Sequence, residues 1–477
     1  MNKRRTLSQE LTTPEHTGAS FLFDNVSFRL PNEALTVLKI LEEAGYEAWF
    51  VGGYVRDSIQ GKDSHDFDLT TSALPEQSKE ALRAQGLAVY ETGIKHGTIT
   101  AILNDIPFEI TTYRSDGTYT DQRHPDAVRF VTSIEEDLAR RDFTCNALAF
   151  HPIRGIIDPY NGLQDIKDST LRCVGCAKKR FEEDALRILR ALRFASCLNF
   201  SLEPKTEEAL FSCKDLLDSV AAERLFAEME KLLCGSNCKT ILLDYVDILG
   251  VFLPELLAMK GFDQKSTYHI YDVLEHSAWA VHYMPVTPLG RWAALCHDMG
   301  KPDVFILDDK GYGHMAGHAQ VSVTHVKTIA KRLKFPKKLT HDVELLVCYH
   351  DTYLKSAPTK RIVRKLYRNM EEKEYLFHTM CDLMRADNLS KAPQYQQIRV
   401  EMANELEEIF NTMMEEEACF GIKDLPLSGH DLIELGFSQG PEIGQALAAL
   451  LEAVVSGEIP ATKEALSEKA LQILNSK

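Results

Sequence analysis

Strand patterns are confined to about the first 150 residues of this chain, and this division restricts the folds that the chain can adopt. Apolar residues recur at helical spacing over 33–44, and the apolar run 47–51 that follows is typical of a short buried strand. Two further strands are expected at 99–103 and 107–112, separated by two turn residues. Beyond Phe181, long amphipathic stretches dominate. The sequence therefore predicts an α+β fold, with a mixed sheet near the N-terminus and helices after it.

Two glycines and three acids stand where a mixed sheet would bring them together. Gly52 and Gly53 directly follow the first expected strand, where they would let the backbone approach a phosphate, although such a pair is also typical of a plain turn. Asp66 and Asp68 come shortly after, and alternate carboxylates on an extended segment project to the same face about 6 to 7 Å apart. Glu109 could complete the set from a neighbouring strand. Paired carboxylates commonly hold Mg²⁺ for phosphoryl transfer from a nucleoside triphosphate.

Five motifs resemble, in order, those of the class II CCA-adding enzyme and bacterial poly(A) polymerase family, within the polymerase-beta nucleotidyltransferase superfamily. They cover roughly residues 30 to 260, and the first motif consists of GGYVRD together with DFDLT. The others are RRDFTCNALAF (140–150), DPYNGLQDI (158–166), EDALRILRALRFA (183–195) and AAERLFAEMEKLL (221–233). The resemblance implies a template-independent enzyme that adds C, C and A to the 3′ end of tRNA from CTP and ATP. An A-adding enzyme or a poly(A) polymerase is the nearest alternative, because the core motifs do not separate these products.

The fourth motif carries the expected choice of base. Asp184, Arg187 and Arg190 are spaced by three residues, so on one helix they would lie on one broad face and could converge on one ligand. A carboxylate only accepts hydrogen bonds and a guanidinium only donates them, which fits the amino group and ring nitrogen of cytosine or adenine but not the edge of uracil. The protein itself would then act as the template. Arg193 would lie about 180° from Asp184 on such a helix, so it would have to reach another part of the nucleotide.

The resemblance also implies a role for each matching residue. Asp66 and Asp68 would bind Mg²⁺ and, with Glu109, form the catalytic acids. The residues expected at the incoming nucleotide are Gly53, Arg56, Arg141, Asp184, Arg187, Arg190 and Arg193. The segment 114–126 resembles the flexible loop of the family, with Gln122 in place of a common glycine, a departure that bears on the switch from C to A addition.

A second constellation lies in the helical part of the sequence. His297 and Asp298 adjoin within an apolar helical run, in RWAALCHDMGKP, and a buried charge there requires a partner such as a divalent metal ion. The pattern resembles the HD phosphohydrolase superfamily. The metal ligands that this resemblance implies are His276, His297, Asp298 and Asp387. His318 and His350 stand where superfamily members with two metals have additional ligands. The identity of the metal is left open by these residue types.

An HD site predicts a second reaction, the hydrolysis of phosphomonoesters or of 2′,3′-cyclic phosphates, because a bound metal lowers the pKa of its water. An alternative of another class is an HD phosphohydrolase whose N-terminal region serves only as an RNA-binding adaptor. A nucleotidyltransferase needs the acids of the first constellation for nucleotide transfer, whereas an RNA-binding adaptor does not transfer nucleotides.

The charge of the chain is unevenly distributed. The formal net charge is −16, but residues 401–477 alone hold fifteen acids and four bases, so a local basic surface for RNA elsewhere is not excluded. The sequence shows no membrane span and no signal peptide, and its eleven scattered cysteines suit a reducing compartment. We therefore expect a cytoplasmic protein, with tRNA, CTP and ATP as its partners and no membrane association.

A chain of 477 residues is too long for one hydrophobic core. Breaks in the pattern predict five segments. They are an N-terminal extension (1–29), a nucleotidyltransferase head (30–160), a helical neck and RNA-binding body (161–262), an HD domain (263–395) and an acidic helical C-terminal region (396–477). The sequence does not indicate the oligomeric state.

Overall fold

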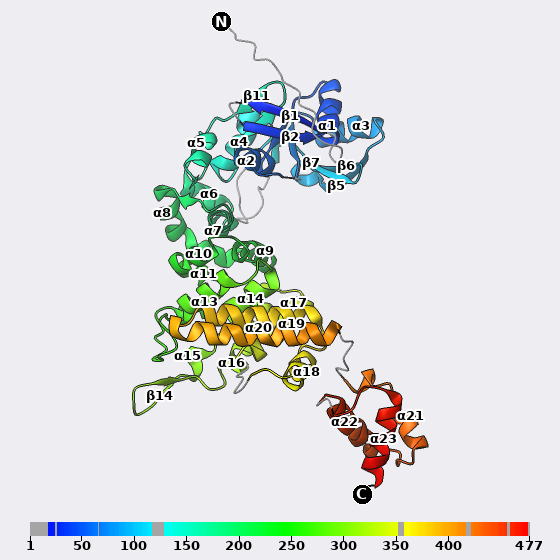
Figure 1. Cartoon of the computed structure of the whole chain (residues 1–477). Coiled ribbons are helices and arrows are strands. Elements are labelled where there is room, and N and C mark those ends of the chain that lie inside the picture. The colour runs from blue at the N-terminus through cyan, green and yellow to red at the C-terminus, as the bar shows by residue number, and fades with distance from the viewer. Residues whose placement is uncertain are drawn as a thin grey trace. The chain divides into compact units, whose positions relative to one another are not determined.

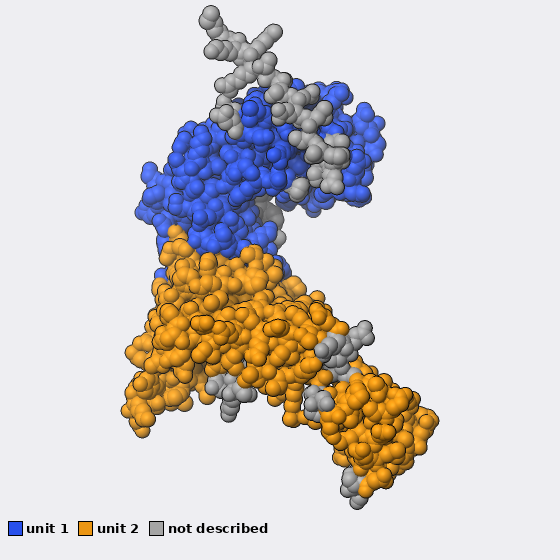
Figure 2. All heavy atoms as spheres, in the orientation of Figure 1, with its two compact units in different colours: residues 1–237, 247–252 blue, residues 238–246, 253–477 orange. Residues whose placement is uncertain are grey.

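The computed structural model describes residues 18–23, 26–64, 66–116, 128–351, 357–415, 421–455 and 458–475. The chain separates into two compact units (Figures 1 and 2). The first comprises 1–237 and 247–252, and the second comprises 238–246 and 253–477. Most of the expected loop 114–126, including Gln122, lies outside the described residues, as do residues 1–17 of the expected N-terminal extension. The division into five segments stays a prediction.

A seven-stranded mixed sheet forms the centre of the first unit, in the order β11-β10-β3-β4-β7-β6-β5 (Figure 1). Its strands are β3 (Ala48–Val51), β4 (Asp68–Thr71), β5 (Ala88–Gly93), β6 (Thr98–Leu103), β7 (Ile106–Thr112), β10 (Ala149–His151) and β11 (Gly155–Ile157). Neighbouring strands are antiparallel, except that β4 and β7 are parallel. The three strands expected from the sequence are confirmed as β3, β6 and β7. All four residues of β3 are buried, which explains its unbroken apolar sequence.

Helices and two short strand pairs flank this sheet. They are β1 (Gly18–Phe23), β2 (Val26–Pro31), α1 (Asn32–Glu43), α2 (Gly53–Ile59), α3 (Pro75–Ala84), η1 (Ile94–His96), β8 (Arg114–Asp116), β9 (Val128–Phe130), α4 (Ile134–Ala139) and η2 (Thr144–Asn146). The expected helix over 33–44 is confirmed as α1, whose buried side chains Ala34, Val37, Leu38 and Leu41 follow the helical period. Because α1 buries this stripe, it fixes the helix-to-strand connection that leads into β3.

The rest of the first unit is helical. Its elements are α5 (Gly162–Lys167), β12 (Thr170–Leu171), α6 (Ala177–Glu183), α7 (Leu186–Leu198), β13 (Ser201–Leu202), α8 (Pro204–Cys213), η3 (Lys214–Ser219), α9 (Ala222–Leu233) and α11 (Val246–Leu249). Helix α7 packs along α9, and Leu189, Leu192, Met229 and Leu232 at this level are fully buried. The packing gives α7 a rigid support on the side away from solvent.

The second unit is almost entirely helical. Its elements are α10 (Cys238–Asp244), α12 (Glu255–Met259), α13 (Val273–Tyr283), α14 (Pro288–Cys296), α15 (Lys301–Val304), β14 (Ile306–Leu307), β15 (Gly313–His314), α16 (His318–Leu333), α17 (Lys337–Tyr349), α18 (Lys360–Asn369), α19 (Glu374–Leu389) and α20 (Pro393–Glu415). Helix α14 is the central element, because it packs against α13, α17 and α19 and buries Trp292 completely. Among the described residues, no helix of either unit is both long enough and apolar enough to cross a membrane.

The last helices of the chain have a core of their own. They are η4 (Ile422–Asp424), α21 (Gly429–Glu434), α22 (Pro441–Val455) and α23 (Lys463–Asn475). Leu432, Phe437, Leu450 and Leu466 are the centre of this cluster. The acidic character of this region therefore lies on the surface of a small packed domain.

A substitution at Gly162, the first residue of α5, tests how closely this helix packs against the backbone of η2. A Cβ at this position would lie 2.2 Å from the carbonyl oxygen of Thr144, so Gly162→Ala forces backbone to move. We expect about 1–3 kcal/mol of destabilisation, seen as a lower thermal midpoint in calorimetry. Gly444→Ala is the matched control: its Cβ meets open space in α22, and the substitution should stabilise that helix by about 1 kcal/mol. Equal midpoints for wild type and Gly162→Ala would contradict the close contact.

Candidate functional site

The glycine loop and the first acids meet at the edge of the sheet. Gly52 lies between β3 and α2 with a φ of 72°, in the left-handed region that favours glycine. A Cβ there would lie 3.3 Å from Asp68 Oδ2 and 3.7 Å from Arg141 Nη1. The loop, the acid and the arginine therefore surround one small space that a side chain would fill. Carboxylate oxygens and an open backbone suit a hard divalent cation together with a phosphate.

Asp68 and Glu109 are neighbours across the parallel strand pair. Leu69 pairs with Ile110, so the preceding residues of β4 and β7 are also adjacent and point to the same face. Asp66 lies two residues before Asp68, the residue at which β4 begins. Burial, together with the negative charges of Asp66 and Glu109, raises the pKa of Asp68 to about 7, and the positive charge of Arg141 opposes this rise. Three acids so close together create a site that a divalent cation would stabilise.

The arginines beside this acid site are held by buried polar side chains. Arg56 donates to Asn146 Oδ1 at 2.7 Å and pairs with Asp57 at 2.8 Å. Arg141 lies 3.4 Å from a carboxylate oxygen of Asp137, which is completely buried. These contacts fix the two guanidinium groups near the glycine loop, where a triphosphate would carry its negative charge.

Asp184 does not share a helix with Arg187 and Arg190, and that expectation is wrong. Asp184 ends α6 in an extended conformation, with φ −138° and ψ 103°, and α7 begins at Leu186. Its Oδ1 atom accepts from the backbone N–H of Leu186 at 3.1 Å. An aspartate at a helix start satisfies an otherwise unpaired N–H, and this local bond competes with helix continuation. Arg187 and Arg190 do lie on α7, as expected.

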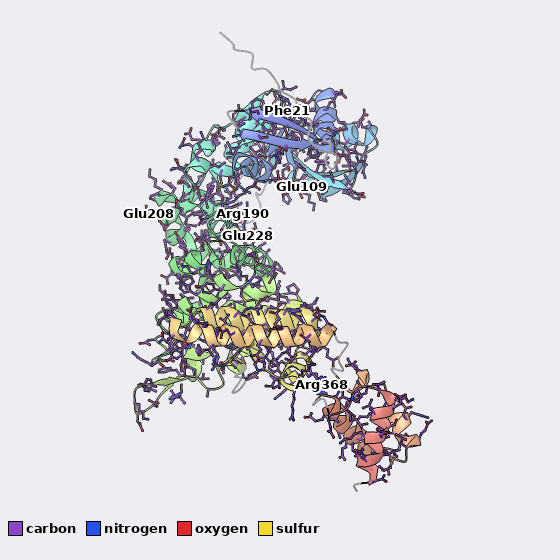
Figure 3. The ribbon with its side chains drawn as sticks, in the orientation of Figure 1. Phe21, Glu109, Arg190, Glu208, Glu228 and Arg368 are labelled. Atoms are coloured by element: carbon purple, nitrogen blue, oxygen red, sulfur yellow. The ribbon has the colours of Figure 1, made fainter. Side chains whose placement is uncertain are left out.

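Helix α9 carries residues that pair with Asp184 and with the arginines of α7. Arg224 Nη2 lies 3.0 Å from Asp184 Oδ2. Four residues further on the same face of α9, Glu228 lies 2.6 Å from Arg193 Nε and 3.7 Å from Arg190 Nη1 (Figure 3 labels Arg190 and Glu228). Arg193 is thus close to Arg190 rather than on the far side of the helix from the site.

Two further partners complete the network. Arg190 donates to Asp142 Oδ2 at 2.6 Å, and Arg187 pairs with Glu183 at 2.9 Å. Burial opposes the charge of Asp142, but Arg190 and Asn146 hold the pKa of this carboxyl well below its usual value. The side chains that were expected to contact the nucleotide base are therefore paired with other residues of the protein in this structure.

Sequence reasoning missed the residues that hold the arginines and Asp184. They are Asp137, Asp142, Asn146, Arg224 and Glu228. Asp142 and Asn146 belong to RRDFTCNALAF, and Arg224 and Glu228 belong to AAERLFAEMEKLL, whereas Asp137 lies outside both motifs. For the four residues within motifs, no spacing shows which side chain each of them contacts.

In the second unit, the structure brings together all six residues expected at the HD site. Ligand atoms of His276, His297, Asp298 and Asp387 lie within 4.8 Å of one another, and so do those of Asp298, His318 and His350. All six residues are buried. They come from α13, the ends of α14 and α17, the start of α16, and α19.

The two oxygens of Asp298 face different histidine pairs. Oδ2 lies 3.2 Å from His276 Nε2 and 3.1 Å from His297 Nε2. Oδ1 lies 3.2 Å from His318 Nε2 and 3.6 Å from His350 Nε2. Asp298 therefore joins the two groups of ligand atoms.

The other ring nitrogen of each histidine faces a backbone carbonyl. Each Nδ1 has a carbonyl oxygen within 2.7–3.2 Å: Ser390 for His276, Ala294 for His297, Met315 for His318 and Val347 for His350. A carbonyl only accepts, so each Nδ1 carries a proton, and the Nε2 atom of each ring presents a lone pair when that ring is neutral. The Nε2 atoms nevertheless lie 3.3 Å apart in one pair and 3.2 Å apart in the other. Such converging lone pairs fit metal ligation, which supplies the missing positive charge.

The acids of this cluster are ionised, as ligands must be. Burial opposes the charge of Asp298, but His297 and Lys301 keep its pKa well below the usual value. Burial likewise opposes the charge of Asp387, and Lys391 and His276 keep its pKa low. The donor set of imidazole nitrogens and carboxylate oxygens suits a transition metal or zinc.

Three family models match the chain. The Poly A polymerase head domain matches residues 48–172, and the "Probable RNA and SrmB-binding site of polymerase A" matches residues 199–260. The tRNA nucleotidyltransferase domain 2 model matches residues 314–470. The first model spans the glycine loop, the acids and Arg141.

Curated relatives are similar over almost the full chain. The CCA-adding enzyme of Levilactobacillus brevis is 33% identical over 443 residues, covering 92% of this chain and 97% of the relative. The CCA-adding enzyme of Leuconostoc mesenteroides is 33% identical over 452 residues, covering 94% of this chain and 98% of the relative.

Solved structures show the same similarity. The Bacillus stearothermophilus CCA-adding enzyme in complex with CTP gives a TM-score of 0.67 at 29% identity, covering 93% of this chain and 98% of that chain. The Thermotoga maritima CCA-adding enzyme complexed with tRNA-CCA gives a TM-score of 0.53 at 20% identity, covering 93% and 95%. At 20% identity, the likeness to the Thermotoga maritima structure shows a shared fold alone.

The raised pKa of Asp68 predicts a pH dependence of metal binding at the acid site. A cation must displace the Asp68 proton below pH about 7, so Mg²⁺ affinity should fall about tenfold per pH unit there and level off above. Glu109→Gln removes a negative neighbour and should move this midpoint downward. Isothermal titration between pH 5.5 and 8, in an Asp298→Asn background that weakens the second cluster, measures it.

Glu91→Gln is the control, because Glu91 is an exposed acid on β5 that pairs with Lys79. Its midpoint should equal that of the parent. Since the folded protein binds the Asp68 proton more tightly than the unfolded chain does, the metal-free protein should also lose stability as pH rises from 3.8 towards 7. An unchanged midpoint in Glu109→Gln would show that Glu109 does not act on Asp68.

Proposed function

The chain belongs to the CCA-adding enzyme family, and from this membership we propose that it completes the 3′ end of tRNA by adding C, C and A from CTP and ATP. It is a nucleotidyltransferase. The observation that carries the proposal is the shared space between Gly52, Asp68 and Arg141, which one Cβ would fill. This is where a triphosphate and a divalent cation would meet.

The residues around this space would have separate roles in nucleotide transfer. Asp66 and Asp68 would hold Mg²⁺, which when bound neutralises the triphosphate and favours ionisation of the attacking hydroxyl. Gly53, Arg56 and Arg141 would orient the phosphates. The 3′ oxygen of tRNA forms a bond to the α-phosphorus, the bond from that phosphorus to the β-phosphate oxygen breaks, and pyrophosphate leaves.

Base selection would use the segment between α6 and α7. The Asp184 carboxylate would accept from the amino group of cytosine or adenine, and Arg187 would donate to the ring nitrogen. Arg190 and Arg193 lie beside Arg187 on the same helix and would contact other parts of the nucleotide. Uracil and guanine present a donor or an acceptor in the wrong place, and the unpaired groups disfavour them.

Replacing the acids should abolish transfer. Asp66→Ala and Asp68→Ala should each lower incorporation of labelled CTP and ATP into tRNA lacking CCA by at least about a hundredfold, because metal neutralisation supplies several kcal/mol. Asp63→Ala is the matched control, since this nearby carboxylate is exposed and pairs with Arg29. Its activity should equal that of wild type.

The same assay separates the family alternatives. Incorporation of ATP alone, with no use of CTP, would contradict CCA addition and favour an A-adding enzyme or a poly(A) polymerase. A wild-type protein inert with both nucleotides would favour the reading in which the first unit serves only as an RNA-binding adaptor.

We also propose a second activity, metal-dependent hydrolysis of phosphoesters at the histidine and aspartate cluster. The convergence of four Nε2 lone pairs on Asp298 carries this proposal. His276, His297, Asp298 and Asp387 would hold one divalent ion, and His318 and His350 would take part in a second with Asp298. A bound ion would supply a water of lowered pKa for attack on phosphorus. The substrates expected are phosphomonoesters and 2′,3′-cyclic phosphates.

Removing one ligand should separate the two activities. His297→Gln keeps side-chain volume but removes an Nε2 ligand, so phosphate release from 4-nitrophenyl phosphate or 2′,3′-cyclic AMP should fall at least about tenfold while CCA addition is retained. His325→Gln is the control, because His325 pairs with Asp303 outside the cluster. Wild-type protein loaded in turn with Mn²⁺, Ni²⁺ and Zn²⁺ that releases no phosphate from these substrates would overturn the hydrolase proposal.

A further inference from the structure

The second unit contains two basic segments in a chain that is acidic as a whole. Residues 326–338 contain six lysines and arginines, residues 360–369 contain five, and neither segment contains an acid, whereas the formal net charge of the chain is −16. Residues 199–260, which match the RNA-binding family model, contain six bases and eleven acids. Because that matched segment is itself acidic, the positive charge that RNA phosphates require has to come from other parts of the chain.

Helix α18 separates its apolar side chains from its charges. Val363, Leu366 and Tyr367 are buried, and the ring of Tyr367 lies 5.0 Å from that of Phe410 in α20. The exposed side chains of α18 include four cations: Lys360, Arg361, Lys365 and Arg368 (Figure 3 labels Arg368). A helix that lies on a membrane inserts its apolar face, but the apolar face of α18 is already packed against the protein. Only its basic face is therefore open to a partner.

The cations of this face are available to an anion. Among the described residues, none forms an ion pair or a hydrogen bond with the side chain of Lys365 or Arg368. Arg361 pairs with Glu452 at 3.2 Å, but the two side chains are 77% and 52% exposed, so this pair adds little stability. An anionic partner would thus gain these charges without breaking a buried ion pair.

The start of α17 extends the same basic surface. His341 Nε2 lies 2.8 Å from Glu371 Oε1, which brings the first turns of α17 to the residues that follow α18. Lys337 and Lys338 are exposed and lie four and three residues before His341, on the same side of α17. Arg368 lies three residues before Glu371. We call Lys337, Lys338, Lys365 and Arg368 the basic surface.

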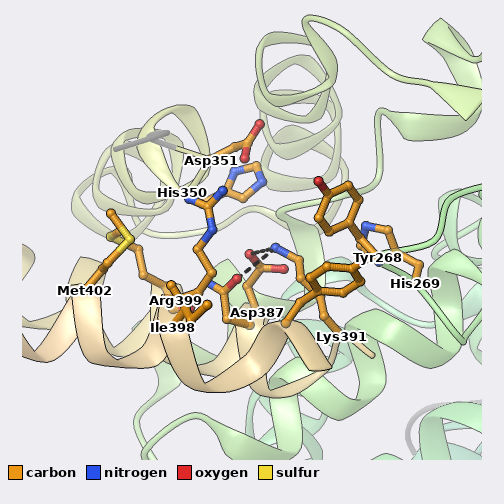
Figure 4. Close-up of a pocket in the computed structure, with 12 residues that line it drawn as sticks. Tyr268, His269, His350, Asp351, Asp387, Lys391, Ile398, Arg399 and Met402 are labelled. Atoms are coloured by element: carbon orange, nitrogen blue, oxygen red, sulfur yellow. Dashed lines mark hydrogen bonds and ion pairs between the residues drawn. The ribbon is translucent and has the colours of Figure 1, made fainter. Parts of the chain in front are cut away.

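The basic surface is separate from the pocket beside the histidine and aspartate cluster. That pocket has a volume of about 470 Å³, and His350 and Asp387 form part of its wall (Figure 4). Its described lining includes no residue of 326–338 or 360–369. A partner on the basic surface therefore need not contact the expected metal ligands, and its binding can be tested independently of them.

We propose that the basic surface binds the phosphate backbone of the tRNA substrate and adds affinity without taking part in nucleotide transfer. The inference rests on the proposed CCA addition, for which it supplies a substrate-docking surface. A row of exposed cations without a recognition pocket suits a polyanion, because contacts to phosphates position a nucleic acid without reading its sequence. An anionic membrane is the alternative that the test separates.

The salt dependence of tRNA binding tests this surface directly. The full chain is titrated against fluorescein-labelled tRNA lacking CCA at several KCl concentrations, and fluorescence anisotropy gives the affinity. The double variant Lys365→Gln/Arg368→Gln should bind about tenfold more weakly than wild type at about 100 mM KCl. The slope of log affinity against log salt should become shallower by about 2, because each lost phosphate contact releases one counterion fewer.

Two further double variants serve as controls. Lys39→Gln/Lys463→Gln removes the same charge from exposed lysines that pair with Glu43 and Asp431, and it should bind tRNA as wild type does. Lys365→Arg/Arg368→Lys retains both charges and should also retain the affinity.

Steady-state transfer distinguishes docking from chemistry. For Lys365→Gln/Arg368→Gln, the KM for tRNA should rise about tenfold, whereas kcat and the KM for CTP should stay within about twofold of wild type. A lower kcat with an unchanged KM for tRNA would contradict a docking role. Thermal unfolding of each variant shows whether a change in affinity comes from loss of the fold.

The remaining outcomes separate this inference from the proposed function. If Lys365→Gln/Arg368→Gln binds tRNA with wild-type affinity and salt dependence, the docking surface is disproved, even where wild type adds CCA. Binding of phosphatidylserine vesicles that only this variant loses would then assign the surface to a membrane. If wild type binds tRNA through the basic surface but incorporates neither CTP nor ATP, the proposed function fails and the docking surface stands.

Discussion

The parallel pairing of β4 with β7 places Asp68 beside Glu109, and the first unit is arranged around this contact between like charges. Such a contact is unfavourable unless cations or strong donors surround it. Arg141 supplies one positive charge, and the open space beside Gly52 admits another. Asp137 and Asn146 in turn hold Arg141 and Arg56. Repulsion at the strand edge thus accounts for a chain of buried polar contacts that extends into the helices.

Local sequence patterns predicted three of the seven strands of the sheet, because burial and turn chemistry act over a few residues. The run AWFV is buried throughout β3, and Asn104 and Asp105 have φ of 50° and 62°, as a tight turn between β6 and β7 requires. The same reasoning failed at Asp184, because helical spacing does not show where one helix stops and the next starts. There a single side-chain bond to Leu186 N outweighs the propensity of the flanking residues.

For the histidine and aspartate cluster of the second unit, the residues could be predicted from the sequence, but their arrangement could not. The pair His297 and Asp298 in an apolar run signals a site, yet the other ligands lie up to 89 residues further along, at Asp387. Only the packing of α13, α16, α17 and α19 around α14 brings them to one point. The position of the proton on each histidine ring could not be predicted either, because it depends on a nearby backbone carbonyl. For His297, His318 and His350, this carbonyl belongs to the residue three positions earlier in the chain.

Helix α9 gives the segment that we propose to recognise the base partners of its own: Arg224 at Asp184 and Glu228 at Arg193. In the proposed mode of binding, an incoming nucleotide exchanges one set of hydrogen bonds for another, and its net gain in free energy is only the difference between the two. A correct base recovers what it displaces, whereas an incorrect base displaces the same contacts and recovers fewer. Such an exchange keeps affinity modest while preserving discrimination, so a nucleotide that has just been added can leave the recognition segment readily and make room for the next.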